Sequence, residues 1–178
     1  MNLKLKRFPS SLLRWFNKKS SSTKIPTHFN KDEKIIRSIF SPINIHNSKG
    51  TLLPNSFRTP PEKDEVSVNR LDYTSVDFCK ELAKKNEKAG DRYYFGFAVL
   101  LKNDIDEANS TIVYSPILAP KSDINPFHSD IKIGYIPQRG EPMPSEYSKK
   151  INDLTSKARF YVDPNPNLIG WFGEDINM

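Results

Sequence analysis

The sequence has very little cysteine, and this shortage excludes several classes of protein. Among 178 residues there is one cysteine, Cys79, so the chain cannot form an internal disulfide or a cysteine-rich zinc site. A reducing compartment is the simplest interpretation, and we predict a cytoplasmic protein. Because buried free cysteines are usually inert, we also predict that Cys79 is a core residue and not a nucleophile.

Long apolar segments and common catalytic motifs are also absent from the sequence. No run approaches the ~20 apolar residues that a membrane-spanning helix needs, and no continuous apolar stretch follows the first lysines, as a secretory signal requires. There is no glycine-rich phosphate loop, GxSxG elbow, HExxH motif or paired CxxC motif. The three histidines lack the spacing of metal ligands. We therefore expect a soluble protein without a cofactor or a metal site.

Acidic residues are missing from the first 30 residues, which carry all of the excess positive charge. This segment contains seven lysines and arginines and no acid, a charge of +7, whereas the other 148 residues carry 20 basic and 21 acidic side chains, a charge of −1. We predict a basic, mobile arm over residues 1–30 and one domain over residues 31–178. A neutral domain lacks the basic footprint of a nucleic-acid-binding surface.

The arm itself has three open interpretations. It can be a loosely docked tail, since its composition is polar and cationic. It can also bind an anionic membrane, a nucleic acid or an acidic partner through residues 4–24, with Trp15 and Phe16 inserted. The third interpretation is an organellar transit peptide, because the arm is basic, contains serine and has no acid. The second interpretation would make the protein membrane-associated, and the third would make it organellar.

Hydrophobic periodicity predicts an α+β fold with a central sheet of four to five strands and helices packed against it. Tyr93 to Leu101 (YYFGFAVLL) is apolar on both faces and is expected as an inner strand. Its Gly96 indicates a bulge or a close backbone approach. The other expected strands cover residues 66–71, 111–118, 130–136 and 160–162, and the expected helices cover residues 31–38, 75–89 and 145–158.

Two connections and one helix face complete these expectations. Residues 41–64 read as a long polar connection with several prolines, and residues 103–109 as an acidic hairpin turn. Thr74 or Ser75 is expected to cap the second helix. In this helix Phe78 and Cys79 belong to the predicted buried stripe, whereas Lys80 is expected to face solvent.

His128 is the main candidate for chemistry, in the segment NPFHSDI. Asp130 lies two residues further on, so both side chains fall on the same side of an extended backbone. A carboxylate that orients a histidine is the arrangement of general-base catalysis. The alternative is structural: His128 bonds a backbone carbonyl and holds the loop in place.

Three arginines are candidates for holding an anion, because a guanidinium pairs well with phosphate or carboxylate. They are Arg37, Arg58 and Arg70. Arg70 ends a predicted strand just before a helix, a junction at which α/β folds often bind ligands. The alternative is a structural ion pair with Glu65, Asp72 or Asp77.

Four segments follow one another along the chain in an order that resembles a loose set of small, uncharacterised microbial proteins. They are SVNR (67–70), GFAVL (96–100), YSPIL (114–118) and NPFHSDI (125–131). The resemblance covers roughly residues 35–135. It implies a strand order but no activity, cofactor or site residue.

Two functions remain open. We predict first a non-enzymatic interaction module, in which the domain presents residues 41–64 to a protein partner and the basic arm acts as a tether. The alternative is a small enzyme that acts on a nucleotide-like or other anionic substrate. In that case His128 is the general base, Asp130 orients it, and Arg70 with Arg37 holds the anion.

Overall fold

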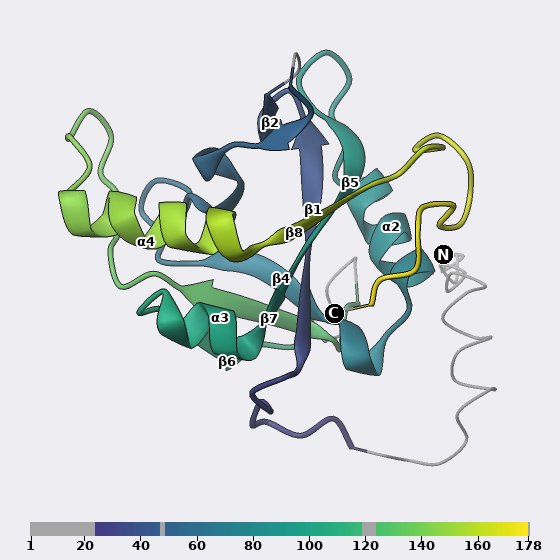
Figure 1. Ribbon diagram of the computed structural model, residues 1–178, viewed down its shortest axis with the longest axis horizontal. Helices are drawn as coiled ribbons and strands as arrows, with labels where there is room; N and C mark the ends of the chain where they lie inside the picture. The colour runs from purple at the N-terminus through teal and green to yellow at the C-terminus, as the bar shows by residue number, and fades with distance from the viewer. Residues whose placement is uncertain (1–23, 47–48, 119–123, 178) are drawn as a thin grey trace, which may run out of the picture.

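The computed structural model describes residues 24–46, 49–118 and 124–177, which form an α+β fold around one antiparallel sheet (Figure 1). The strand order is β6-β7-β4-β1-β5-β8, so the sheet has six strands and not the predicted four to five. Its strands are β1 (Lys34–Ser41), β4 (Val66–Arg70), β5 (Tyr93–Leu101), β6 (Thr111–Tyr114), β7 (His128–Lys132) and β8 (Arg159–Val162).

Helices and one small hairpin complete the fold. The helices are α2 (Val76–Lys85), α3 (Lys102–Glu107) and α4 (Ser145–Lys157), with 3-10 turns η1 (Pro54–Phe57) and η2 (Leu71–Tyr73). The hairpin consists of β2 (Ile45–His46) and β3 (Thr51–Leu52). Over the described ranges, no helix is long and apolar enough to cross a membrane.

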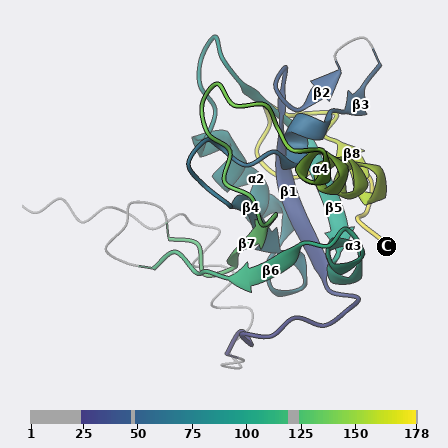
Figure 2. The ribbon, with the colours of Figure 1, turned by 90° about the vertical axis from the view of Figure 1, so that its left-hand side faces the viewer.

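Different helices cover the two faces of the sheet (Figure 2). On one side, the α4 face, Ile35 and Ile39 of β1 pack in a core cluster with residues of α3 and α4. On the other side, the α2 face, Ile36 packs with Cys79 and Ala83 of α2. Alternate residues of one strand therefore enter two separate cores, as the two-residue period of a strand requires.

The strand β1 corrects the prediction of a helix over residues 31–38. Ile35, Ile36 and Ile39 are at most 1% exposed, and β1 pairs with β5 along its whole length, from Lys34 opposite Leu101 onward. Two adjacent β-branched residues that are both buried fit a strand between two layers better than a one-sided helix. The helical spacing of the isoleucines was therefore misleading.

The strand β5 confirms the prediction of an inner strand, since it lies between β1 and β8. A side-chain carbon added at Gly96 would lie 2.2 Å from the carbonyl oxygen of Tyr161 in β8. The close backbone approach expected from this glycine is therefore present. The pairing of β1 with β5 also shifts by one residue beside it, between Ile39 and Phe40.

In α2 the predicted cap is confirmed, but the predicted exposure of Lys80 is wrong. Ser75 accepts a hydrogen bond from the N–H of Phe78 at the start of the helix. Lys80 is 2% exposed, and its Nζ lies 2.6 Å from Oδ2 of Asp163. The amine also donates to the carbonyl of Gly170. The C-terminal segment lies against α2 and buries a lysine that helical periodicity assigned to solvent.

The connections contain more regular structure than predicted. Most of the acidic turn expected over residues 103–109 belongs to the short helix α3, whose Ile105 is buried in the core. The expected connection over residues 41–64 contains β2, β3 and η1. Short elements of this kind carry too few residues for a periodic signal.

Candidate functional site

A groove with a volume of about 790 Å³ lies beside the sheet on its α2 face. It forms where β1 and β4 separate: these strands pair only at Ile35–Arg70 and Ile36–Asn69. The C-terminal end of α2 lines one side, and residues 137–141 line another. In Figure 2, the turn after α2 and the loop before α4 both lie on the same side of the sheet as α2.

Four arginines from four separate segments line this groove: Arg37, Arg58, Arg92 and Arg139. Within the described ranges, none of their guanidinium groups forms an ion pair with a carboxylate. This sets them apart from the buried cations Arg70 and Lys80, each of which has its own acid. Unneutralised guanidinium groups that converge on a concave surface attract and hold anions.

Acidic residues do little to neutralise the groove. Glu65 and Glu141 are the two carboxylates among the described residues that line it. Glu65 is already paired, since its Oε1 lies 2.7 Å from Nζ of Lys132. The hydrogen bond and the charge of Lys132 lower the pKa of Glu65. The net charge of the groove lining is therefore positive, although the domain as a whole is nearly neutral.

Arg37 is the most enclosed of the four arginines. It extends from β1 into the gap beside β4, where Nη1 donates to the carbonyl of Ser67 at 2.8 Å and Nε donates to the carbonyl of Ser56. Burial lowers its pKa to about 10, so the side chain still carries its charge at neutral pH. Its acceptors are neutral carbonyls, which leaves the positive charge available to a ligand.

Arg58, Arg92 and Arg139 lie nearer the opening. Arg58 and Arg139 are exposed, whereas Arg92 is half-buried with its guanidinium 5.2 Å from the ring centroid of Phe40. Sequence reasoning had singled out Arg37 and Arg58 but missed Arg92 and Arg139. Both lie in turns without a recognisable motif, and only the tertiary fold brings them to the groove.

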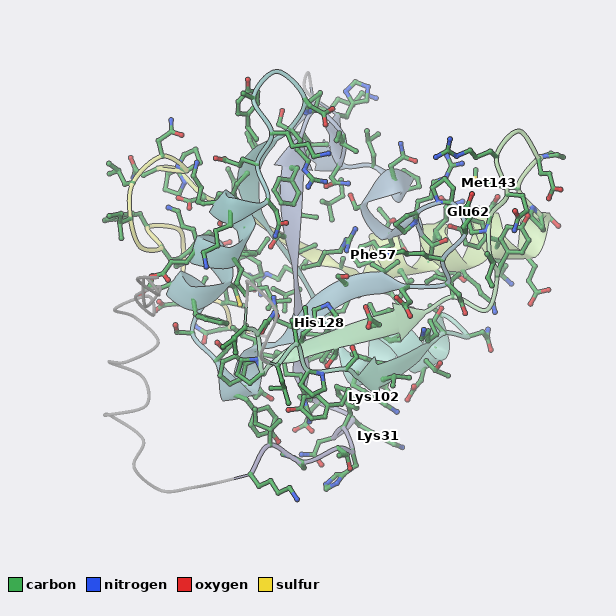
Figure 3. All side chains as sticks on the ribbon, turned by 180° about the vertical axis from the view of Figure 1, so that it is seen from behind. Lys31, Phe57, Glu62, Lys102, His128 and Met143 are labelled. Atoms are coloured by element: carbon green, nitrogen blue, oxygen red, sulfur yellow. The ribbon has the colours of Figure 1, made fainter. Side chains whose placement is uncertain are left out.

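His128 also lines the groove, at the first residue of β7 (Figure 3). Its Nδ1 lies 2.9 Å from the carbonyl oxygen of Ser115 and 3.1 Å from the hydroxyl of the same residue. A ring N–H at Nδ1 that donates to the carbonyl leaves Nε2 as the free nitrogen. The structural contact considered for His128 is therefore present, and it also fixes the orientation of the ring.

Asp130 does not hold His128 in the way that catalysis by a carboxylate–histidine pair requires. The closest approach is 3.8 Å, between Oδ1 of Asp130 and Nε2 of His128, which is too long for a hydrogen bond. Oδ2 of Asp130 instead accepts a hydrogen bond of 2.5 Å from the Ser115 hydroxyl. The serine proton is thus directed to the aspartate, so these three residues are not arranged as a Ser-His-Asp triad.

Arg70 lies on the opposite face of the sheet from His128. Asn69 is the cross-strand partner of His128, so the next residue, Arg70, points to the α4 face. Arg70 is fully buried, its Nε donates to Oε1 of Glu33 at 2.5 Å, and its Nη2 donates to Oε2 of the same residue at 2.8 Å. Arg70 therefore forms a bidentate ion pair with Glu33. The acids considered from the sequence were others, namely Glu65, Asp72 or Asp77.

Arg70 also connects the sheet to the end of the predicted arm. Its guanidinium donates to the carbonyls of Pro26 and His28 and lies 4.1 Å from the ring centroid of Phe29. The contacts of the domain therefore begin before Lys31. Residues 1–23, which include Trp15 and Phe16, lie outside the described residues, so the arm over residues 1–30 stays a prediction.

Together the arginines can bind an anion, and the same groove offers one imidazole nitrogen. The described part of the chain contains no group of three His, Cys, Asp or Glu side chains that could hold a metal ion. Comparisons of the chain with known protein families, with curated proteins and with solved structures find no match.

Proposed function

We propose that the protein binds a small anionic molecule of nucleotide-like size in the groove on the α2 face. The observation that carries this proposal is the convergence of Arg37, Arg58, Arg92 and Arg139, none of which has a carboxylate partner among the described residues. Arginine binds phosphate and carboxylate groups through paired N–H donors. Four such groups from four segments also explain why the binding residues form no sequence motif.

The dimensions of the groove support a small ligand. Its volume of about 790 Å³ falls within the ~300–1,000 Å³ typical of sites for small molecules and cofactors. Apolar side chains, among them Phe40, Ile43 and Leu82, line it together with the arginines. A mixed lining of this kind suits an organic anion with an apolar or aromatic part better than an inorganic ion alone.

Catalysis is a second candidate, because His128 lines the same groove as Arg37. With Nδ1 bound to the Ser115 carbonyl, Nε2 can accept a proton from a bound substrate. Release of phosphate from a nucleotide by the wild type, lost in His128→Gln at unchanged melting temperature, would support this role. If the wild type binds the nucleotide but releases no phosphate, the protein binds its ligand without catalysis.

The interaction module with a tethering arm also stays a proposal. Residues 41–64 contribute Ile43, Asn44 and Arg58 to the lining of the groove. We therefore place their main contribution in the site itself, while a protein partner at their outer surface remains compatible with it.

Titration of the full-length protein with inorganic pyrophosphate tests the proposal. The double variant Arg58→Ala/Arg139→Ala removes two exposed groove cations with no described side-chain partner. A matched double variant, Lys149→Ala/Lys157→Ala, removes two cations from α4 on the other face of the sheet. Calorimetry should show a loss of at least tenfold in affinity, or about 1.4 kcal/mol, for the first variant alone.

Two results would contradict the proposal. One is the absence of pyrophosphate binding by the wild type at low ionic strength. The other is an equal loss in both double variants, since a general electrostatic attraction depends on the number of cations and not on their place.

A further inference from the structure

We propose that the end of the groove away from the arginines recognises a nucleobase, through Asn69 of β4 and His128 of β7. This inference rests on the proposed function and narrows the ligand to a nucleotide. Both residues line the groove, and they are direct cross-strand partners. Their side chains therefore project from neighbouring strands on the same face of the sheet, with Cβ atoms about 5 Å apart.

Internal hydrogen bonds fix which atom each of the two side chains presents. Oδ1 of Asn69 accepts a hydrogen bond of 2.6 Å from Nδ2 of Asn125, so Asn69 offers its own Nδ2 as a donor. No residue in the described ranges accepts from that nitrogen. His128 donates from Nδ1 to the Ser115 carbonyl, so it offers Nε2 as an acceptor.

A donor beside an acceptor matches the edge of a nucleobase. Adenine presents the acceptor N7 next to the donor N6–H₂ on one edge, and the other bases also carry adjacent donors and acceptors. A simple sugar phosphate has no such planar edge. The pair formed by Asn69 and His128 therefore adds a form of recognition that the arginines cannot provide.

Apolar side chains flank this end of the groove. Leu82 comes from α2, which packs on β1 and β5, whereas Ile117 comes from the connection between β6 and β7. In the strand order these elements lie on opposite sides of β4. Partly exposed aliphatic groups on both sides suit the flat faces of a heterocycle, whose burial removes apolar surface from water.

The distance between the two ends fits one nucleotide. Arg37 donates to the carbonyl of Ser67, which precedes Asn69 by two residues in β4. Two residues of a strand span about 6.6 Å, a length comparable to the sugar between a base and its phosphate. The phosphate would then lie among the arginines and the base against Asn69 and His128.

Affinities of the full-length protein for adenosine monophosphate and ribose 5-phosphate test this inference, because the two compounds differ by the base. We expect the wild type to bind the nucleotide about tenfold more tightly, a preference that stacking and base contacts commonly provide. Asn69→Ala and His128→Ala, measured separately, should each reduce this preference by a larger factor than they change the affinity for pyrophosphate. Melting temperatures identify a variant that fails to fold. If one of the two variants fails to fold, the nucleotide preference of the other variant tests the inference.

The outcomes separate the two proposals. Equal affinity of the wild type for both compounds, with pyrophosphate still bound, overturns base recognition and leaves the anion site intact. A preference that survives both substitutions places the base elsewhere and also overturns the inference. Failure to bind any of the three compounds overturns the proposed function itself.

Discussion

Arg37 and Arg70 lie on adjacent strands and serve different purposes. Arg70 is fully buried against Glu33 and connects the segment before β1 to the sheet. Arg37 donates to two backbone carbonyls, lies over the ring of Phe57 and lines the groove. The strand period starts both side chains on the α4 face, since Arg70 is opposite Ile35 and Arg37 follows Ile35 by two residues. The difference arises because β1 and β4 have already parted at Arg37, whose side chain extends into the gap between them.

Removal of Glu33 should test the structural purpose of Arg70. Glu33→Ala leaves a buried guanidinium without its carboxylate and should lower the free energy of unfolding by about 3–5 kcal/mol. The control Asp106→Ala removes the surface pair with Lys102 and should cost less than about 1 kcal/mol. Urea denaturation measures both. Similar losses in the two variants would mean that the Glu33–Arg70 pair is not a major contact.

Cys79 should behave as a core residue and not as a nucleophile. Its side chain is fully buried, and burial raises the pKa of the thiol far above neutrality. The reactive thiolate is therefore scarce at pH 8. We expect a thiol reagent such as 5,5′-dithiobis(2-nitrobenzoic acid) to label the folded protein very slowly and the urea-unfolded protein at once. Rapid labelling of the folded protein would contradict this.

At the scale of the elements, the sequence predicts those with a long, one-sided or fully apolar pattern. The nine-residue strand β5 and the helix α4, expected over residues 145–158, were predicted correctly. The strand β1 was not, because its isoleucines fit a helical period as well as a strand buried on both faces.

Contacts between distant segments could not be predicted. Lys80 is buried by a C-terminal segment about 85 residues away, and the groove gathers Arg92 and Arg139 from two turns without a motif. His128 was recognisable as a candidate from its neighbourhood in the sequence. Its partner, the Ser115 carbonyl, depends on the pairing of β6 with β7 and left no signal in the sequence.

Gly96 should be essential for the pairing of β5 with β8. In Gly96→Val the first side-chain carbon would lie 2.2 Å from the carbonyl oxygen of Tyr161, so the strands must separate. We expect a loss of more than about 2 kcal/mol in thermal or urea unfolding. The control Gly50→Asn, at a position with open space and a φ of +61°, should change stability by less than about 1 kcal/mol. A tolerated Gly96→Val would contradict this strand register.

At the scale of the whole molecule, charge is unevenly distributed. The first 30 residues carry +7 and the other 148 carry −1. Nevertheless, four arginines without an ion pair among the described residues gather in one groove of the nearly neutral domain. If the proposed function holds, anions have two candidate regions to bind, the predicted arm and the groove. Experiments on binding must separate these two regions.

Truncations should locate the start of the folded domain. A chain that begins at Lys24 should keep the melting temperature of the full protein. A chain that begins at Lys31 loses the carbonyls of Pro26 and His28 that bind Arg70, and with them Phe29 over its guanidinium. We expect its melting temperature to fall by several degrees. An unchanged melting temperature at Lys31 would show that these contacts contribute little.

Hydrogen exchange of the full-length protein, with and without pyrophosphate, tests the arginine groove most directly because it locates the ligand. Binding there should slow exchange in residues 55–61, 86–92 and 137–141, which supply three of the four arginines and the walls around them. Exchange in α4, on the other face of the sheet, should stay unchanged. Protection confined to the first 30 residues, with none at the groove, would contradict an anion site in the domain.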